Sequence, residues 1–217
     1  MRMAGHLIRR LALAAGAALP AAGGPALAHP HVTVVAQSAL VLDAAGRIAA
    51  IRHRWTFDEA YSAFATAGMK TTADGRIDPQ ELKDLAKLNV ESLSEFNYFT
   101  VLKQGSRSLA LDPPAEGYGL EQDGKALALT FVLPLKSPVA PTTGTSLRVD
   151  DETFFVSFSF APTNPVTIEG RTSCKVEVKA PKKAPDQALA QRGEEFFGAL
   201  RSGFTDDFVT TVRLQCP

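Results

Sequence analysis

The spacing of apolar residues divides the chain into a hairpin, a helical insert and a strand-rich remainder. Residues 32–42 and 47–57 alternate apolar and polar positions on either side of a turn at 43–46, which predicts a β-hairpin. Residues 57–67 place aromatic side chains at spacings of four and three, and residues 79–96 keep apolar side chains on one helical face. The pattern therefore predicts two amphipathic helices directly after the hairpin.

The rest of the chain has short apolar runs separated by Pro- and Gly-containing turns, which is typical of strands. The candidate strands are residues 98–103, 118–122, 126–135, 146–149, 154–160 and 174–179. Residues 186–201 predict a late helix, and residues 208–214 a final strand. We expect one α+β domain, mostly antiparallel, with an inserted EF-hand-like helix-loop-helix at 57–96 and a C-terminal helix.

The N-terminus predicts a signal peptide. A basic start is followed by an apolar run at 11–19, too short to span a bilayer, and by a small-x-small sequence at 26–28. Removal of residues 1–28 leaves a single periplasmic domain of residues 29–217. The arginine pair at 9–10 leaves twin-arginine export open as an alternative to the Sec route.

The balance of charged residues gives the chain no strong attraction to polyanions such as nucleic acids. The chain has 23 basic and 23 acidic residues, and loss of three arginines with the signal peptide makes the mature domain mildly acidic. With 45% hydrophobic residues, this composition excludes a disordered chain and a nucleic-acid binder driven by basic charge. We expect no nucleic-acid partner and no stable membrane insertion.

The mature chain keeps two cysteines, Cys174 and Cys216. In an oxidising compartment an even pair usually forms a disulfide, whereas a metal site would need deprotonated thiols that oxidation removes. We therefore predict a structural disulfide that ties the last strand to an earlier one.

Histidines at the processed N-terminus are the best candidate metal ligands. Cleavage after residue 28 would leave His29-Pro30-His31, so that the α-amine and imidazole of His29 could chelate one ion together. Imidazole suits copper, nickel and zinc. Because Pro30 has no N–H to lose, the four-nitrogen square-planar mode is blocked, and a brace or an open imidazole site is left.

Hairpin geometry suggests the remaining ligands. If Asp43 faces Gly46, His31 lies opposite Asp58, and alternation places both on one polar face. His53 then falls on the other face, where a packed core histidine is the alternative to a ligand. For the terminal histidines the alternative is a frayed terminus.

The segment between the two predicted helices resembles a twelve-residue calcium loop at 70–81. Gly75 occupies the sixth place, and the oxygen-ligand places are held by Asp74, Asp78 and Glu81. The first place is Lys70, however, and the third is only Thr72. Helix capping alone also explains these residues, since Asp78 suits the N-cap, Pro79 the first helical position and Glu81 the third. We therefore do not expect calcium as a cofactor.

No motif for catalysis is found in the sequence. It has no nucleophile elbow, P-loop, dinucleotide fingerprint or Cys-x-x-Cys pair. The Phe-rich strand at 154–160 could offer an aromatic ligand surface, although core packing is the ordinary interpretation. We predict a protein that is not an enzyme.

Several motifs together resemble a bacterial family, the domain-of-unknown-function family numbered one thousand and seven. They are AHPHV at 28–32, RHRWTFDE at 52–59, YSAF at 61–64, DGRIDPQEL at 74–82, NVESL at 89–93 and FNYFT at 96–100. Residues 150–160 and the two cysteines extend the resemblance over essentially the whole mature chain.

The resemblance implies a periplasmic protein, often described as the periplasmic component of an uncharacterised ABC-type transport system. Members often accompany nickel/cobalt or zinc transport genes. They commonly carry a more acidic loop where this chain has Lys70 and Thr72, a departure that weakens a calcium role. The chain also lacks the two α/β lobes of a typical solute receptor, which suggests an accessory component.

Our leading hypothesis is a periplasmic accessory protein that binds a nickel, cobalt, zinc or copper ion. His29 and His31 would bind it, with Asp58 or His53 as the remaining ligand, and a membrane metal transporter or ABC permease as the partner. One rival is a metal-free binding or assembly module for a membrane transporter. A weaker rival is a copper oxidoreductase of histidine-brace type.

Overall fold

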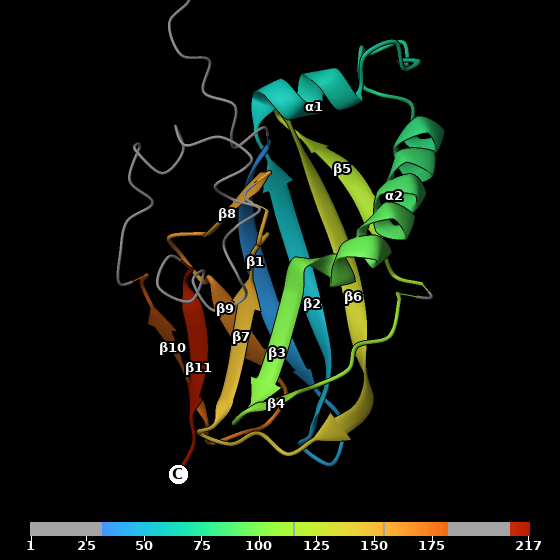
Figure 1. Cartoon of the computed structure of the whole chain (residues 1–217). Coiled ribbons are helices and arrows are strands. Elements are labelled where there is room, and N and C mark those ends of the chain that lie inside the picture. Colours follow the sequence, from blue (N-terminus) through green and yellow to red (C-terminus); the bar gives the residue numbers. More distant parts are fainter. Residues whose placement is uncertain (1–31, 115, 154, 182–208) are drawn as a thin grey trace, which may run out of the picture.

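The computed structural model describes residues 32–114, 116–153, 155–181 and 209–217. In this part of the chain two β-sheets pack face to face, and a helical insert lies at one end of them (Figure 1). The two longest strands, β1 (Val32–Leu42) and β6 (Ala126–Val139), both belong to the first sheet.

The first sheet has six strands in the order β5-β6-β2-β1-β8, and β9 also pairs with β1. The bounds of the other four are Gly119–Asp123 for β5, Ile48–Phe57 for β2, Val156–Phe160 for β8 and Val166–Glu169 for β9. β8 and β9 run parallel to β1 and pair with successive parts of its edge. The other pairs are antiparallel, so the sheet is mixed.

The second sheet is antiparallel, in the order β10-β11-β7-β3-β4. The strand bounds are Lys175–Lys179 for β10, Thr211–Gln215 for β11, Thr145–Val149 for β7, Thr100–Gln104 for β3 and Arg107–Ser108 for β4. The inner faces of the two sheets meet in an aliphatic core, to which Ile51 contributes from the first sheet and Leu147 from the second.

The helical insert consists of α1 (Glu59–Ala65), α2 (Pro79–Leu93) and the 3₁₀ segment η1 (Ser94–Phe99). α1 is joined to β6 because the Ser62 hydroxyl accepts the Leu127 N–H at 2.9 Å. α2 buries Ala86 and Val90 in an aromatic core beside the first sheet. Asp78 caps α2 at Gln80 N with Pro79 in the first turn, as the sequence predicts.

The fold class is confirmed as α+β and mostly antiparallel, and most predicted strands lie within a few residues of observed ones. The short strands β4 and β9 were not predicted. The second helix is shorter than expected, because the chain leaves the α-helix at residue 93 and turns through η1. The predicted helix at 186–201 lies outside the described residues.

The predicted hairpin register is wrong by two residues, since Thr33 rather than His31 lies opposite Asp58. The Asp43 N–H donates to Arg47 O, so Gly46, at φ 75°, lies inside the turn and does not close it. A bulge next to Val41 adds the second residue of the shift. Because the error is even, each side chain keeps its predicted face.

Candidate functional site

His53 lies fully buried between the two sheets, as the alternation along β2 predicts. Its Nδ1 is 2.9 Å from the Ser38 hydroxyl of β1, and its Nε2 is 3.3 Å from Thr100 Oγ1 of β3. The Thr100 hydroxyl gives its own proton to Tyr98 O, so it accepts from His53 Nε2–H and leaves Nδ1 to accept from Ser38. Both ring nitrogens are therefore engaged within the protein.

Burial also fixes the charge of His53. Desolvation lowers the pKa of this imidazole from 6.5 to about 3, so the ring is neutral at neutral pH. The side chain links β1, β2 and β3 and packs against the Phe131 ring at a centroid distance of 5.0 Å. In this arrangement His53 is a structural residue between the sheets, and neither nitrogen faces an open coordination site.

Asp58 lies at the end of β2, where it caps α1. Its Oδ1 accepts the Tyr61 N–H at 2.8 Å, and its Oδ2 accepts the Thr33 N–H of β1 at 2.7 Å. Partial burial raises the pKa of Asp58, but these N–H groups together with that of Ala60 outweigh it and lower the pKa below its usual value. The group is an ionised carboxylate with lone pairs left over.

The structure separates the two described candidate ligands. The His53 side chain faces the interior. Asp58 lies five residues later in the chain and accepts the Thr33 N–H near the start of β1. His29 and His31 lie outside the described residues. Within the described ranges, no group of three or more His, Cys, Asp and Glu side chains could hold a metal ion.

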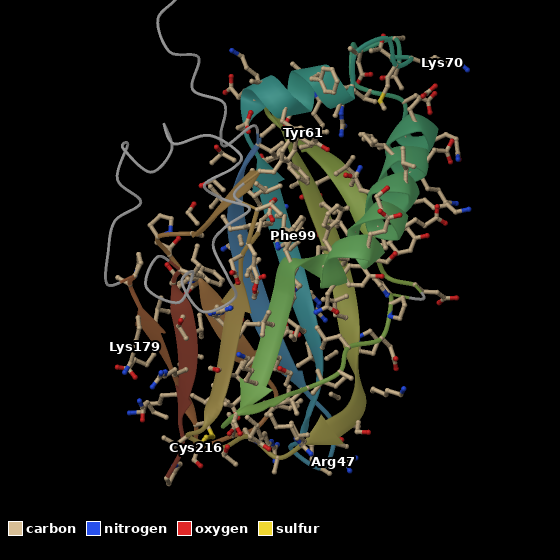
Figure 2. All side chains as sticks on the ribbon, viewed as in Figure 1. Arg47, Tyr61, Lys70, Phe99, Lys179 and Cys216 are labelled. Atoms are coloured by element: carbon tan, nitrogen blue, oxygen red, sulfur yellow. A yellow bond between two sulfur atoms is a disulfide. The ribbon has the colours of Figure 1, made fainter. Side chains whose placement is uncertain are left out.

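The loop at 70–81 is held by its own hydrogen bonds. The Asp78 N–H donates to Lys70 O, and the Arg76 carbonyl accepts both the N–H and the hydroxyl of Thr72. Asp74 accepts from the Thr72 hydroxyl as well. Two of these acceptors, the Asp74 carboxylate and the Arg76 carbonyl, stand at the fifth and seventh places of a calcium loop. Lys70 lies at the exposed tip of the insert (Figure 2).

The Lys70 ammonium is also 4.0 Å from Glu81, the side chain at the last ligand place. The insert has the predicted helix-loop-helix order, with α1 before the loop and α2 after it. Its EF-hand character is a prediction that these contacts do not test.

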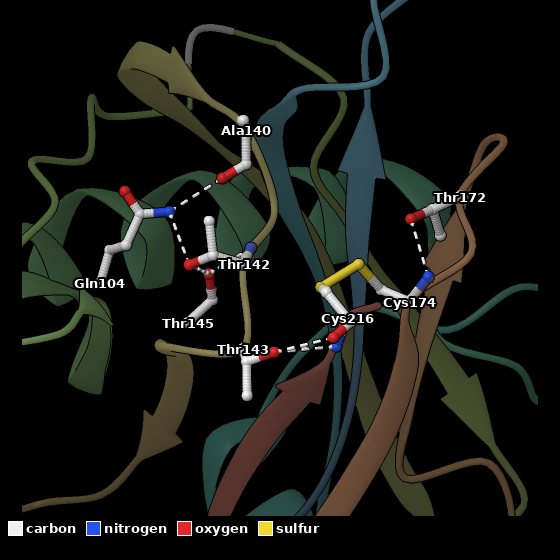
Figure 3. Close-up of a disulfide and its surroundings, with 8 residues drawn as sticks. All are labelled: Gln104, Ala140, Thr142, Thr143, Thr145, Thr172, Cys174 and Cys216. Atoms are coloured by element: carbon white, nitrogen blue, oxygen red, sulfur yellow. Dashed lines mark hydrogen bonds between the residues drawn. A yellow bond between two sulfur atoms is a disulfide. The ribbon is translucent and has the colours of Figure 1, made fainter.

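The predicted disulfide joins Cys174 and Cys216 at the ends of β10 and β11 (Figure 3). The Cys216 N–H donates to the Thr143 hydroxyl at 3.2 Å, and that hydroxyl donates to Cys216 O at 3.0 Å. The C-terminal strand is thus fastened to its neighbouring strand and to the turn before β7.

An aromatic cleft of about 460 Å³ opens beside the aliphatic core, between the first sheet and the α2–η1 segment. Val32 and Val34 of β1 and Trp55 of β2 line it on the side of the first sheet. Tyr61 of α1 and Phe99, the last residue of η1, also line it (Figure 2). Almost the whole lining is apolar, which is typical of a small-molecule site.

The sequence interpretation missed most of this cleft. Phe158 of the Phe-rich strand does line it, but Phe96 and Phe99 were assigned to a helix end and a strand start. A usable signal was the run of aromatic residues around Asn97, a residue type that tolerates the left-handed conformation seen there.

Among the described residues, no helix has both the length and the apolar character needed to cross a membrane.

Comparison with known proteins identifies the family but no activity. An uncharacterized 15.5 kDa protein in the trpE 3' region of Spirochaeta aurantia is 28% identical over 96 residues, which is 44% of this chain and 68% of that protein. The family model described as "Protein of unknown function (DUF1007)" matches residues 13–216. The chain therefore belongs to the DUF1007 family.

Proposed function

We propose that this chain is a periplasmic accessory protein of a membrane transport system. In this proposal it binds one nickel, cobalt, zinc or copper ion at its processed N-terminus and is not an enzyme. The disulfide is consistent with an oxidising compartment such as the periplasm. The transport role rests on the family resemblance.

The observation that supports the metal site most directly is the position of Asp58. Its carboxylate holds the Thr33 N–H at 2.7 Å, only two residues beyond His31 in the sequence. Two residues of chain span at most about 7 Å, so the His31 imidazole is within reach of this carboxylate. The lowered pKa of Asp58 keeps it ionised where imidazoles are neutral and able to bind metal.

The proposed ligand set follows from these positions. His29 supplies its amine and imidazole, His31 a second imidazole, and Asp58 an oxygen. A set of three nitrogens and one carboxylate oxygen suits late first-row metals. His53 is left out, because Ser38 and Thr100 already engage both of its nitrogens.

Calorimetry on natively exported protein tests the proposal. Intact mass first establishes that the chain begins at His29, and the apo protein is then titrated with nickel, cobalt, copper and zinc. We expect one-to-one binding with a submicromolar Kd, which is a free energy stronger than about −8 kcal/mol. No binding tighter than about 0.1 mM would contradict the proposal.

Matched variants locate the site. Replacing His29 by alanine, or placing one extra alanine before it, should weaken binding at least about hundredfold, since either change destroys the amine–imidazole chelate. Asp58→Asn should weaken it about tenfold while keeping an N-cap residue. Asp78→Asn makes the same change at the cap of α2 and should leave binding unchanged. Equal losses in the two Asn variants would argue against Asp58 as a ligand.

The rival function is a metal-free assembly module. It is favoured by two large apolar side chains exposed on the insert, Phe64 of α1 at 80% and Leu88 of α2 at 60%. A transport assay in cells that carry the His29→Ala, His31→Ala double variant separates the two. Unaltered transport would favour the assembly role.

A further inference from the structure

We infer that the aromatic cleft is a binding site for a small, neutral, apolar ligand that carries one hydrogen-bond acceptor. This inference does not depend on the proposed metal site, because it rests on side chains of the described core. At about 460 Å³ the cleft falls within the range of small-molecule sites and has room for a two-ring aromatic compound.

Trp55 supplies the reason for the acceptor. Its indole lies in the cleft wall with 1% of its surface exposed, 5.0 Å from the Phe158 ring and 4.8 Å from the Phe131 ring. Among the residues that the structure describes, its Nε1–H has no hydrogen-bond partner. A buried donor without a partner costs free energy. Since this nitrogen is itself covered, a ligand acceptor recovers that free energy when the side chains around the indole move aside to admit it.

The backbone of η1 supplies a second, independent observation. Asn97, Tyr98 and Phe99 follow one another at φ values of 49°, 53° and 47°, in a region that residues other than glycine enter at a cost. The turn sends the Tyr98 side chain into the core and places Phe99 on the cleft, 5.4 Å from Phe158. Strain of this kind concentrates at functional sites, and here it builds one wall of the cleft.

The charges around the cleft determine which ligands it accepts. Among the described residues that line it, none is basic, and the one carboxylate is that of Asp151. That carboxylate already accepts the N–H and hydroxyl of Thr153 and the N–H of Val156. An anionic head group would therefore meet a carboxylate and no cation, which excludes anionic lipids and favours a neutral ligand.

Titration with Prodan, a neutral naphthalene dye with one ketone oxygen, tests the inference. Trp55 is the single tryptophan of the chain, so its emission reports directly on this site. We expect saturable one-to-one binding, quenching of the Trp55 emission and a blue shift of the dye. The propyl analogue of Prodan, in which a methylene group replaces the ketone, should bind about tenfold more weakly, the value of one hydrogen bond.

Three variants assign the contacts. Trp55→Phe removes the donor and should weaken Prodan about tenfold while changing the affinity of the propyl analogue less than about twofold. Ser92→Phe places a ring at an exposed α2 position that lines the cleft and should abolish binding of both dyes. Lys83→Phe adds the same ring at an exposed α2 position outside the cleft and should change neither.

Several results would overturn the inference. Absence of saturable binding below about 1 mM excludes the site, and binding that Ser92→Phe does not weaken excludes this location. Equal affinity of the two dyes for the unmodified protein excludes the acceptor, even if Trp55→Phe fails to fold. Prodan binding that occurs only after deletion of residues 29–31 would make the chain's own N-terminus the occupant and exclude an external ligand.

Discussion

The two ends of the sandwich bury different kinds of side chain. Between the sheets the core is aliphatic and closed, with Leu40, Ile51 and Leu147 each at most 1% exposed. At the other end the core is built around Trp55 and Phe131, and it contains the cleft.

Strand length explains this difference. Each strand of the second sheet has at most five residues, whereas β1 has 11 and β6 has 14. The first sheet therefore extends beyond the second, and α2 with η1 covers the part left over. Two facing sheets are separated by about 10 Å, which branched aliphatic side chains fill. The space between a helix and a sheet is less regular. Aromatic rings pack there without filling it, and the unfilled part is the cleft.

His53 lies at the boundary between the two ends. Its hydrogen bonds reach Ser38 in the first sheet and Thr100 in the second, directly after the strained turn of η1. The comparison suggests a division of roles, in which the aliphatic end supplies stability and the aromatic end supplies binding. Stability should then respond most strongly to changes at the aliphatic end.

The largest effect is expected from removal of the disulfide. The Cys174→Ser, Cys216→Ser double variant opens a loop with a sequence separation of 42 and should lower the free energy of unfolding by about 4 kcal/mol. Urea unfolding measures the loss. Hydrogen exchange should show earlier opening of β10 and β11, and earlier opening of β2 would contradict the division of roles.

Truncation of one side chain at each end compares them directly. Leu147→Ala leaves a void in the closed core and should cost about 3 kcal/mol. Phe99→Ala should cost about 1 to 2 kcal/mol, less than usual for a phenylalanine, because it enlarges a space that is already open. Urea unfolding of both variants provides the measurement, and equal costs would show that the cleft wall is part of the stabilising core.

Acid should lower the free energy of unfolding through His53, which lies at the boundary between the two ends. Because the pKa of His53 is about 3 in the folded protein, against 6.5 for an imidazole exposed to water, the unfolded state binds more protons below pH 6.5. Stability should therefore fall as the pH drops through 6.5, by about 2 kcal/mol at pH 5. His53→Gln should lose most of this pH dependence in urea unfolding between pH 7 and 5. An unchanged slope would place its origin elsewhere.

The elements could be predicted from the sequence because their signals are local. The bounds of β1 match the alternation at 32–42, and Asp78 with Pro79 marks the start of α2 correctly. The burial of His53 also followed from alternation. The register did not, because it depends on the conformation of Gly46 inside the turn and on a bulge that no residue type announces.

Most of the cleft was not predicted, because its walls come from segments far apart in the chain. Trp55, Phe99 and Phe158 meet only after the sheet and η1 have formed. A left-handed Tyr98 or Phe99 also has no sequence signature, since neither residue type favours that region. By contrast, His29 and His31 were proposed as metal ligands from a local signal, their position directly after the predicted cleavage site, and both lie outside the described residues.

The smallest change in stability, with a clear change in binding, is expected for Phe96→Ser. This ring is 53% exposed at the cleft and stacks on Phe99 at a centroid distance of 5.2 Å. Its loss should change the free energy of unfolding by less than about 0.5 kcal/mol, as for most surface positions. Prodan affinity should nevertheless fall severalfold, since an aromatic contact contributes about 1 kcal/mol.

Phe64→Ser, at an exposed α1 position outside the cleft, is the matched control and should leave Prodan affinity unchanged. If Phe96→Ser instead lowered stability and left the dye bound as before, the aromatic end would be a core like the other, and the division of roles between the two ends would be lost.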